Sequence, residues 1–215
     1  RVGPARGPQW SAGGGEGPWG WGDSGRREPK KRTCAAAGRC EAASDGCEGA
    51  NAVGPRELRV RGQDRPWALG EAELATSWLD ALQPNASDSL RLAIRAHHLR
   101  RFETPRDTYP AGRAGYLKWR IHLYDVAAEH AATILHANGY DDATIDRVAQ
   151  LIHKRDVKSD ADAQTYEDVL CLVFLESQFT DFAARTDPAS PDTIVAKTLA
   201  KMSAAAQAGC APFSA

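Results

Sequence analysis

Residues 97–122 combine basic, aromatic and histidine side chains more densely than a fold requires. The segment is HHLRRFETPRDTYPAGRAGYLKWRIH, and its acidic residues are Glu103 and Asp107. Its basic residues, apart from the histidines, are Arg100, Arg101, Arg106, Arg113, Lys118 and Arg120. Arginine presents a rigid fork of N–H donors that matches phosphate and carboxylate groups. The segment therefore predicts a site for an anion.

The spacing of these residues indicates how they would converge. His98 and Arg101 are three residues apart, so on a helix they share one face. Arg101 leads into a proline-bounded loop that carries Arg106 and Tyr109, and Arg113 begins the next helix, where backbone N–H groups favour anions. The alternative is that these arginines form surface ion pairs and stack on aromatic rings.

A second group of residues has the chemistry of metal ligands. His153 ends one helix of the expected fold, and Glu167 and Asp168 lie in the next. Together with His98 they could supply nitrogen and oxygen ligands to a divalent metal. The alternative is structural: a histidine is favoured at a helix C-terminus by the helix dipole, and the acids can pair with arginines of residues 97–122.

Composition restricts the partners and the compartment. The formal net charge of the 215 residues is −1, so no global field favours nucleic acid or a membrane surface. No run of about 18 apolar residues is present, which argues against a membrane-spanning helix. The odd number of cysteines, with Cys171 inside the apolar run VLCLVFL, fits a reducing compartment better than a disulfide framework. We therefore expect a cytoplasmic protein whose partner is an anionic small molecule.

Three segments are expected along the chain. Residues 1–56 are rich in glycine and contain no Leu, Ile, Phe or Met, so they are expected to form a disordered tail. Residues 57–205 are expected to form a single all-helical domain, and residues 206–215 a frayed C-terminal tail.

Helical periodicity dominates the domain after a short extended piece, ELRVRGQDRPW. The pattern predicts an all-α bundle of about six helices, with the run Val169–Leu175 at its centre because that run is apolar almost all round. The expected helices span residues 71–82, 88–102, 113–138, 141–155, 163–184 and 192–205, separated by proline, glycine and aspartate signals.

Four motifs in this order resemble the domain-of-unknown-function family 4202. They are HHLRRFETPRDTYPAGRAGYLKWR, GYDDATIDRVAQLI, KSDADAQTYEDVLCLVFLESQF and KTLAKMS. The resemblance extends from about residue 51 to residue 203, and it implies a helical fold without naming a reaction.

The order of residues is also distantly similar to the His-Asp (HD) superfamily of metal-dependent phosphohydrolases, which would make the bundle HD-like. In that resemblance His98 takes the first ligand position, His153 the middle one and Asp168 the last. The chain departs from the family pattern because Lys154 follows His153 where an aspartate is required. A lysine can help to bind phosphate, but it cannot activate a bound water as a metal does.

Two functions follow from these observations. The first is a helical module that binds a phosphate-bearing small molecule, such as a nucleotide, and has a degenerate metal site. Its ligand-binding residues would be His98, Arg101, Arg106, Tyr109, Arg113 and Lys154. The alternative is a metal-dependent HD-type phosphohydrolase that uses a divalent metal held by His98, His153 and Asp168.

Overall fold

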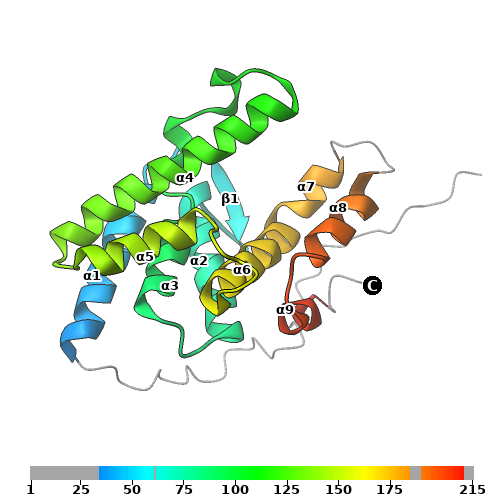
Figure 1. Cartoon of the computed structure of the whole chain (residues 1–215). Helices are drawn as coiled ribbons and strands as arrows, with labels where there is room; N and C mark the ends of the chain where they lie inside the picture. The colour runs from blue at the N-terminus through cyan, green and yellow to red at the C-terminus, as the bar shows by residue number, and fades with distance from the viewer. Residues whose placement is uncertain (1–33, 61, 185–189, 211–215) are drawn as a thin grey trace, which may run out of the picture.

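The computed structural model describes residues 34–60, 62–184 and 190–210, and within them the chain is almost entirely helical. The predicted all-α class is confirmed: this part contains nine α-helices, two short 3-10 turns and one two-stranded hairpin. The helices are α1 (Cys34–Asn51), α2 (Trp67–Leu82), α3 (Asp88–Ala96), α4 (Gly112–Ala137), α5 (Asp142–Ile152), α6 (Ala161–Ser177), α7 (Phe179–Ala184), α8 (Ser190–Leu199) and α9 (Ala204–Gly209). Figure 1 shows α2, α3 and α6 in the middle, α1, α4 and α5 on one side, and α7, α8 and α9 on the other.

Helix α6 lies at the centre of the core, as its sequence predicted. Val169 and Leu172 are 0% exposed, and Val173 and Leu175 are also buried. The helix begins at Asp160, whose carboxylate accepts hydrogen bonds from two backbone N–H groups of the first turn. An apolar surface on nearly every side allows α6 to pack against several helices at once.

Helix α1 corrects the expectation that residues 1–56 form a disordered tail. Cys40, Ala43 and Cys47 are buried at helical spacing, and a Cβ added at Gly46 would lie 2.9 Å from a methyl carbon of Ile134 in α4. Small residues permit this close packing, so the helix docks without any large aliphatic side chain. Arg95 of α3 pairs with Glu48 and strengthens the contact. Residues 1–33 lie outside the described part of the chain.

The second expected helix ends earlier than its periodicity predicted. Helix α3 stops at Ala96, and the chain makes a tight turn through residues 97–100. Arg100 adopts the left-handed conformation (φ 53°), and its N–H donates to the Asn51 side chain at the end of α1. A left-handed residue cannot continue a right-handed helix, so the helix predicted to residue 102 cannot extend through Arg100. The turn places His97 and His98 opposite α2.

The C-terminal segments also differ from the expectation. The helix predicted over residues 163–184 breaks at Gln178 into α6 and α7, and the break brings the Gln178 amide to α2. The expected frayed tail from residue 206 begins instead with ordered residues: Ala206 and Cys210 are buried in the core. Within the described ranges, no helix has the length and apolar character needed to cross a bilayer.

The expected extended piece is an antiparallel hairpin of β1 (Glu57–Val60) and β2 (Gln63–Pro66). It leads directly into α2, so Trp67 begins that helix at the base of the hairpin. Gly70 permits the hairpin to lie close to α2, because a Cβ there would be 3.1 Å from a Val60 methyl carbon.

Candidate functional site

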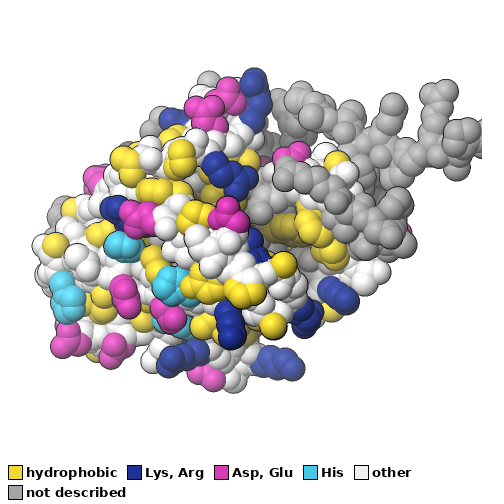
Figure 2. Space-filling view, turned by 90° about the horizontal axis from the view of Figure 1, so that it is seen from above, with side chains coloured by type: hydrophobic (Ala, Val, Ile, Leu, Met, Phe, Trp, Pro, Cys, Tyr) yellow, Lys and Arg dark blue, Asp and Glu magenta, His cyan; other side chains and the backbone are white. Residues whose placement is uncertain are grey.

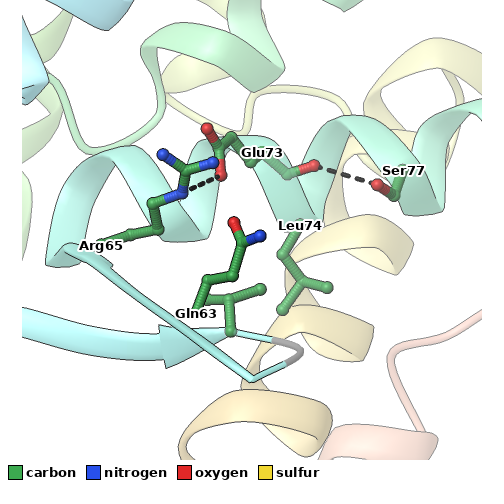
Figure 3. A pocket seen from close by; sticks show the side chains of 6 residues that line it. Gln63, Arg65, Glu73, Leu74 and Ser77 are labelled. Atoms are coloured by element: carbon green, nitrogen blue, oxygen red, sulfur yellow. Dashed lines mark hydrogen bonds and ion pairs between the residues drawn. The ribbon is translucent and has the colours of Figure 1, made fainter.

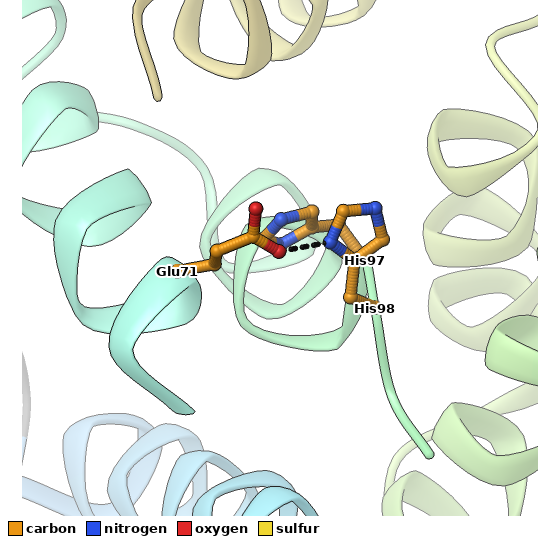
Figure 4. Close-up of side chains that lie close together, drawn as sticks. All are labelled: Glu71, His97 and His98. Atoms are coloured by element: carbon orange, nitrogen blue, oxygen red, sulfur yellow. Dashed lines mark hydrogen bonds and ion pairs between the residues drawn. The ribbon is translucent and has the colours of Figure 1, made fainter. Parts of the chain in front are cut away.

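A buried carboxylate on α2 forms the base of the site. Glu71 is 0% exposed, and it shares the inward face of α2 with Leu74, Ala75 and Trp78, as the spacing 71, 74, 75 and 78 requires. Its Oε2 lies 2.5 Å from His98 Nδ1, and its Oε1 accepts a hydrogen bond from Gln178. Figure 4 shows Glu71 reaching from α2 toward the two imidazole rings.

Arginine fixes the protonation of His98. The Nη1 atom of Arg101 lies 2.7 Å from His98 Nε2. A guanidinium can only donate, so Nε2 accepts and the single proton of the neutral ring is on Nδ1. Nδ1 then donates to Glu71. Arg101, His98, Glu71 and Gln178 therefore form one continuous chain of hydrogen bonds.

The neighbouring His97 is arranged differently. It is buried, and its Nδ1 lies 2.8 Å from the Ile94 carbonyl oxygen. Since a carbonyl only accepts, Nδ1 carries the proton and Nε2 carries the lone pair. Within the described residues this Nε2 has no hydrogen-bond partner. Burial lowers the pKa of His97 to about 4, and the nearby cations Lys154 and Arg101 act in the same direction, so the ring is neutral at pH 7.

The same environment perturbs the other two groups. Burial raises the pKa of Glu71 to about 8, although the positive charges of Arg101 and Arg56 oppose the rise. Burial also lowers the pKa of His98 well below its ordinary value, and His97 and Arg101 add to that effect. A buried acid beside two neutral imidazoles is typical of functional sites.

Three arginines next to this group lie over aromatic rings, and we refer to them with those rings as the arginine–aromatic cluster. The guanidinium carbon of Arg101 lies 5.0 Å from the Trp67 ring centroid and 4.8 Å from that of Trp119. The guanidinium carbon of Arg56 also lies over the Trp67 ring, 5.5 Å from its centroid. The cluster consists of Arg56, Arg101, Arg120, Trp67, Tyr116, Trp119 and Tyr124.

Arg120 completes the cluster from α4. It donates to the hydroxyl groups of Tyr116 at 3.0 Å and Tyr124 at 2.5 Å. Burial lowers the pKa of Arg101, Glu71 opposes this, and Arg120 and Arg56 lower it further, which shows that the three charges act on one another. Among the described residues, no carboxylate forms an ion pair within 4.0 Å with these three arginines, although Glu71 and Glu167 act on them over longer distances.

The surface above α4 is mixed in character. Figure 2, seen from the side on which α4 lies in Figure 1, shows Lys and Arg side chains interspersed with hydrophobic and acidic ones. Tyr116 is 41% exposed, and Leu117 and Ile121 are exposed on the same helix. The face therefore carries no broad field of one sign, and any anion site on it must be local.

Arg106 of the proline-bounded loop has a structural role. Arg106 donates to the carbonyl oxygens of Tyr109 and Pro110, at 2.9 Å each. The loop then lies so close to α4 that a Cβ on Gly115 would be 1.9 Å from the Pro110 oxygen. Only glycine fits there, and the contact places the Thr104 carbonyl 2.9 Å from the Trp119 indole nitrogen, which donates to it.

Of the six predicted ligand-binding residues, the structure joins His98 directly to Arg101. Arg113 is exposed at the start of α4, and the Tyr109 ring lies against His122. Lys154, in the left-handed conformation, donates to Glu167 at 2.5 Å. The pocket as predicted from sequence thus stays a prediction, with two of its members in direct contact.

The predicted metal ligands have other partners. His153 Nε2 lies 2.9 Å from Asp125 Oδ1, and its Nδ1 faces the Ala149 carbonyl. Asp168 accepts from the Ser203 N–H and hydroxyl at the start of α9. In the described part of the chain, the group of three whose possible ligand atoms lie within 4.8 Å of one another is Glu71, His97 and His98.

Two surface depressions are lined by residues outside the arginine–aromatic cluster. One, of about 290 Å³, lies between the hairpin and α2, and Figure 3 shows Arg65 and Glu73 paired across it at 3.5 Å. The other, of about 360 Å³, is lined by residues of α4 and by His153. In the first depression the opposite charges neutralise each other, so it offers an anion no net attraction.

Sequence reasoning missed Glu71, His97 and the cluster residues Arg56 and Trp67. The position of Glu71 had a detectable pattern, because an acid at the spacing of buried apolar residues in WALGEAELATSWL is unusual. The roles of Arg56 and Trp67 depend on tertiary contacts with Arg101, which no local pattern encodes.

Comparison with known proteins gives one match. The family model described as "Domain of unknown function (DUF4202)" matches residues 41–213. No curated protein matches the chain, and no solved structure does.

Proposed function

We propose that this chain, which belongs to the DUF4202 family, binds a small molecule carrying a phosphate group at the arginine–aromatic cluster. One observation supports the proposal most strongly. The charges of Arg56, Arg101 and Arg120 are held next to one another on aromatic rings, and in the described residues no carboxylate pairs with them. Adjacent like charges repel, and a dianion would remove that repulsion.

The neutral partners of these arginines favour an anionic ligand. Arg101 donates to a neutral imidazole and Arg120 to two phenols, so each guanidinium keeps its full charge. Charge-assisted hydrogen bonds from arginine to phosphate are stronger than either of these contacts. The partly buried position also increases their strength because the local dielectric constant is lower than in water.

The aromatic rim favours a ligand with a planar part. Tyr116 is 41% exposed at the edge of the cluster, next to Trp119 with ring centroids 6.0 Å apart. A base or another flat ring could stack on the exposed face of Tyr116 while its phosphate meets Arg120. A nucleotide has both parts.

The contacts favour binding over hydrolysis of the HD type. Hydrolysis would require His98, His153 and Asp168 around one ion, whereas the last two are engaged with Asp125 and Ser203. Asp168 also fixes the start of α9, so moving it toward an ion would cost those hydrogen bonds. The phosphate-binding function needs no such rearrangement.

Isothermal titration calorimetry with inorganic pyrophosphate and with AMP tests the proposal. We expect both to bind the full chain, and Arg101→Met to weaken binding roughly tenfold to a hundredfold, the effect of losing one charge-assisted hydrogen bond. Arg91→Met is the matched control, because Arg91 pairs with Asp80 at 2.6 Å outside the cluster. Equal affinities for the two variants, or no binding by the unmodified chain, would refute the proposal.

A further inference from the structure

The lone pair of His97 Nε2 is held inside the protein without a described partner. The ring is 3% exposed, and its other nitrogen donates to the Ile94 carbonyl. A buried acceptor without a partner costs free energy, because it has lost its hydrogen bonds to water. Histidines that bind metals have this arrangement: one nitrogen donates to a backbone carbonyl, which orients the ring and leaves the other nitrogen for the ion.

Two further possible metal ligands lie beside the His97 ring. Glu71 and His98 each offer one ligand atom, and with His97 the three atoms lie within 4.8 Å of one another. Figure 4 shows both imidazole rings next to the Glu71 carboxylate. An ion with donors at about 2.0–2.2 Å holds those donors roughly 3–4 Å apart, so modest side-chain rotations would close the site.

We propose that Glu71, His97 and His98 form a binding site for one divalent transition-metal ion, of which Zn²⁺ is the probe of choice. Two imidazole nitrogens and one carboxylate oxygen are a ligand set that zinc and neighbouring metals prefer over magnesium or calcium. Three protein ligands leave a coordination position for water or for a ligand oxygen. These ligands differ from the set predicted from the sequence, His98, His153 and Asp168. Here the carboxylate comes from α2, and both imidazoles come from the turn that follows α3.

The local charges are consistent with an ion at this position. The Glu71 carboxylate would offset part of the charge of the ion, and its present hydrogen bonds come from an imidazole and an amide. The positive charges of Arg101 and Lys154 oppose the ion, and their repulsion will reduce its affinity.

Metal binding and the Arg101–His98 hydrogen bond exclude each other. The neutral His98 ring has one lone pair, which now accepts from Arg101. If the ion binds Nε2, it takes the place of Arg101. If the ion binds Nδ1, the proton moves through solvent from Nδ1 to Nε2, which can then only donate. In both cases the ion frees the Arg101 Nη1 donor that now faces His98, which adds one hydrogen-bond donor for a phosphate to those that Arg101 already offers; this consequence rests on the proposed function above.

Zinc titration of the full chain tests the site, with Co²⁺ as a spectroscopic substitute. We expect one equivalent of Zn²⁺ to bind, and at least about tenfold weaker binding for His97→Ala and Glu71→Gln, since even outer-shell changes cost tenfold to a hundredfold. His136→Ala is the control, because His136 is exposed near the end of α4. A Co²⁺ spectrum with a thiolate charge-transfer band, or equal binding by all variants, would refute the site.

Arg101→Met separates this inference from the proposed function. Without the guanidinium, His98 has no competing donor and the ion meets less repulsion, so we expect zinc to bind several-fold more tightly. A misfolded variant could bind zinc through exposed cysteines, so the gain supports the site only if the Co²⁺ spectrum of Arg101→Met has no thiolate charge-transfer band. Unchanged or weaker zinc binding would contradict the exclusion argument. If zinc binds as expected while pyrophosphate binds nowhere, the metal site stands and the phosphate function fails.

Discussion

Two buried glutamates on adjacent helices have opposite environments. Glu167 of α6 lies 2.5 Å from Lys154 Nζ and 3.7 Å from Lys201 Nζ. Burial alone would raise its pKa, but Lys154, Lys201 and Arg120 bring the pKa below the ordinary value. Glu71 of α2 has no such partner: its hydrogen bonds come from a neutral imidazole and an amide, and its pKa rises to about 8.

These two environments suit different roles: Glu167 has a structural role, whereas Glu71 is suited to binding a ligand. The Glu167–Lys154 pair is complete, so both charges are satisfied within the fold. The Glu71 group has no such direct pair: no cation is hydrogen-bonded to Glu71, and in the described residues no carboxylate is in direct contact with the arginines beyond His98. A cation at Glu71 and an anion at the arginine–aromatic cluster would each supply what is missing. We therefore interpret the Glu167–Lys154 pair as structural, and the Glu71 group with its arginines is the region where we propose that ligands bind.

The largest expected effect is on stability, at Lys154. In Lys154→Met the Glu167 carboxylate would stay buried without its bonded cation, which typically costs about 3–5 kcal/mol in the free energy of unfolding. We expect the low end of that range because Lys201 remains 3.7 Å away. Urea denaturation measures the change, and adding Glu167→Gln to the variant should recover part of it. A decrease of less than 1 kcal/mol in the free energy of unfolding would contradict this expectation, because an exposed ion pair contributes about that much.

Exchanging each acid for its amide should reveal the contrast directly. Glu167→Gln removes a charged partner from Lys154, and we expect a loss of about 1.5–3 kcal/mol. Glu71→Gln should cost less than that, because the carboxyl is already largely protonated at pH 7 and the Gln178 amide can turn over to accept. Both values come from urea denaturation at pH 7. Equal costs would remove the distinction between the two regions.

A third carboxylate, at the surface, should show the smallest effect and a defined pH dependence. The hydrogen bond from Arg147, aided by the first N–H groups of α6, lowers the pKa of Asp160 from 3.8 to about 2. A carboxyl with a depressed pKa stabilises the fold fully above its unfolded value and loses that contribution as the pH falls through its folded value. Between pH 4 and pH 2, the melting temperature should therefore fall slightly more for the unmodified chain than for Asp160→Asn. A steeper fall in the variant would be the contrary result.

Much of the fold could be predicted from the sequence because it rests on local periodicity. The core run Val169–Leu175 and the long helix predicted over residues 113–138 follow from patterns of apolar residues and turn signals, whereas the extended piece was predicted without its pairing into a hairpin. Helix α1 was missed because its contacts use alanine, glycine and cysteine, which a count of large aliphatic residues overlooks. The end of α3 was missed because the Asn51 side chain, far away in sequence, stabilises the left-handed Arg100.

The candidate site was only partly predictable for the same reason. His98 and Arg101 were identified from spacing within one segment, and the structure joins them. Glu71 lies 27 residues before His98, and Gln178 lies 107 residues after Glu71, so their meeting depends on how the helices pack. The turn at residues 97–100 likewise determines that His98 faces an arginine and that His97 keeps a buried lone pair. No sequence pattern specifies this difference.

A crystal structure of the full chain grown with pyrophosphate tests the central claim most directly. We predict the anion within hydrogen-bond distance of the Arg101 and Arg120 guanidinium groups, with the Arg101–His98 contact replaced by contacts to phosphate oxygens. An anion bound instead at Arg106 and Arg113, with Arg101 still 2.7 Å from His98 Nε2, would contradict the account.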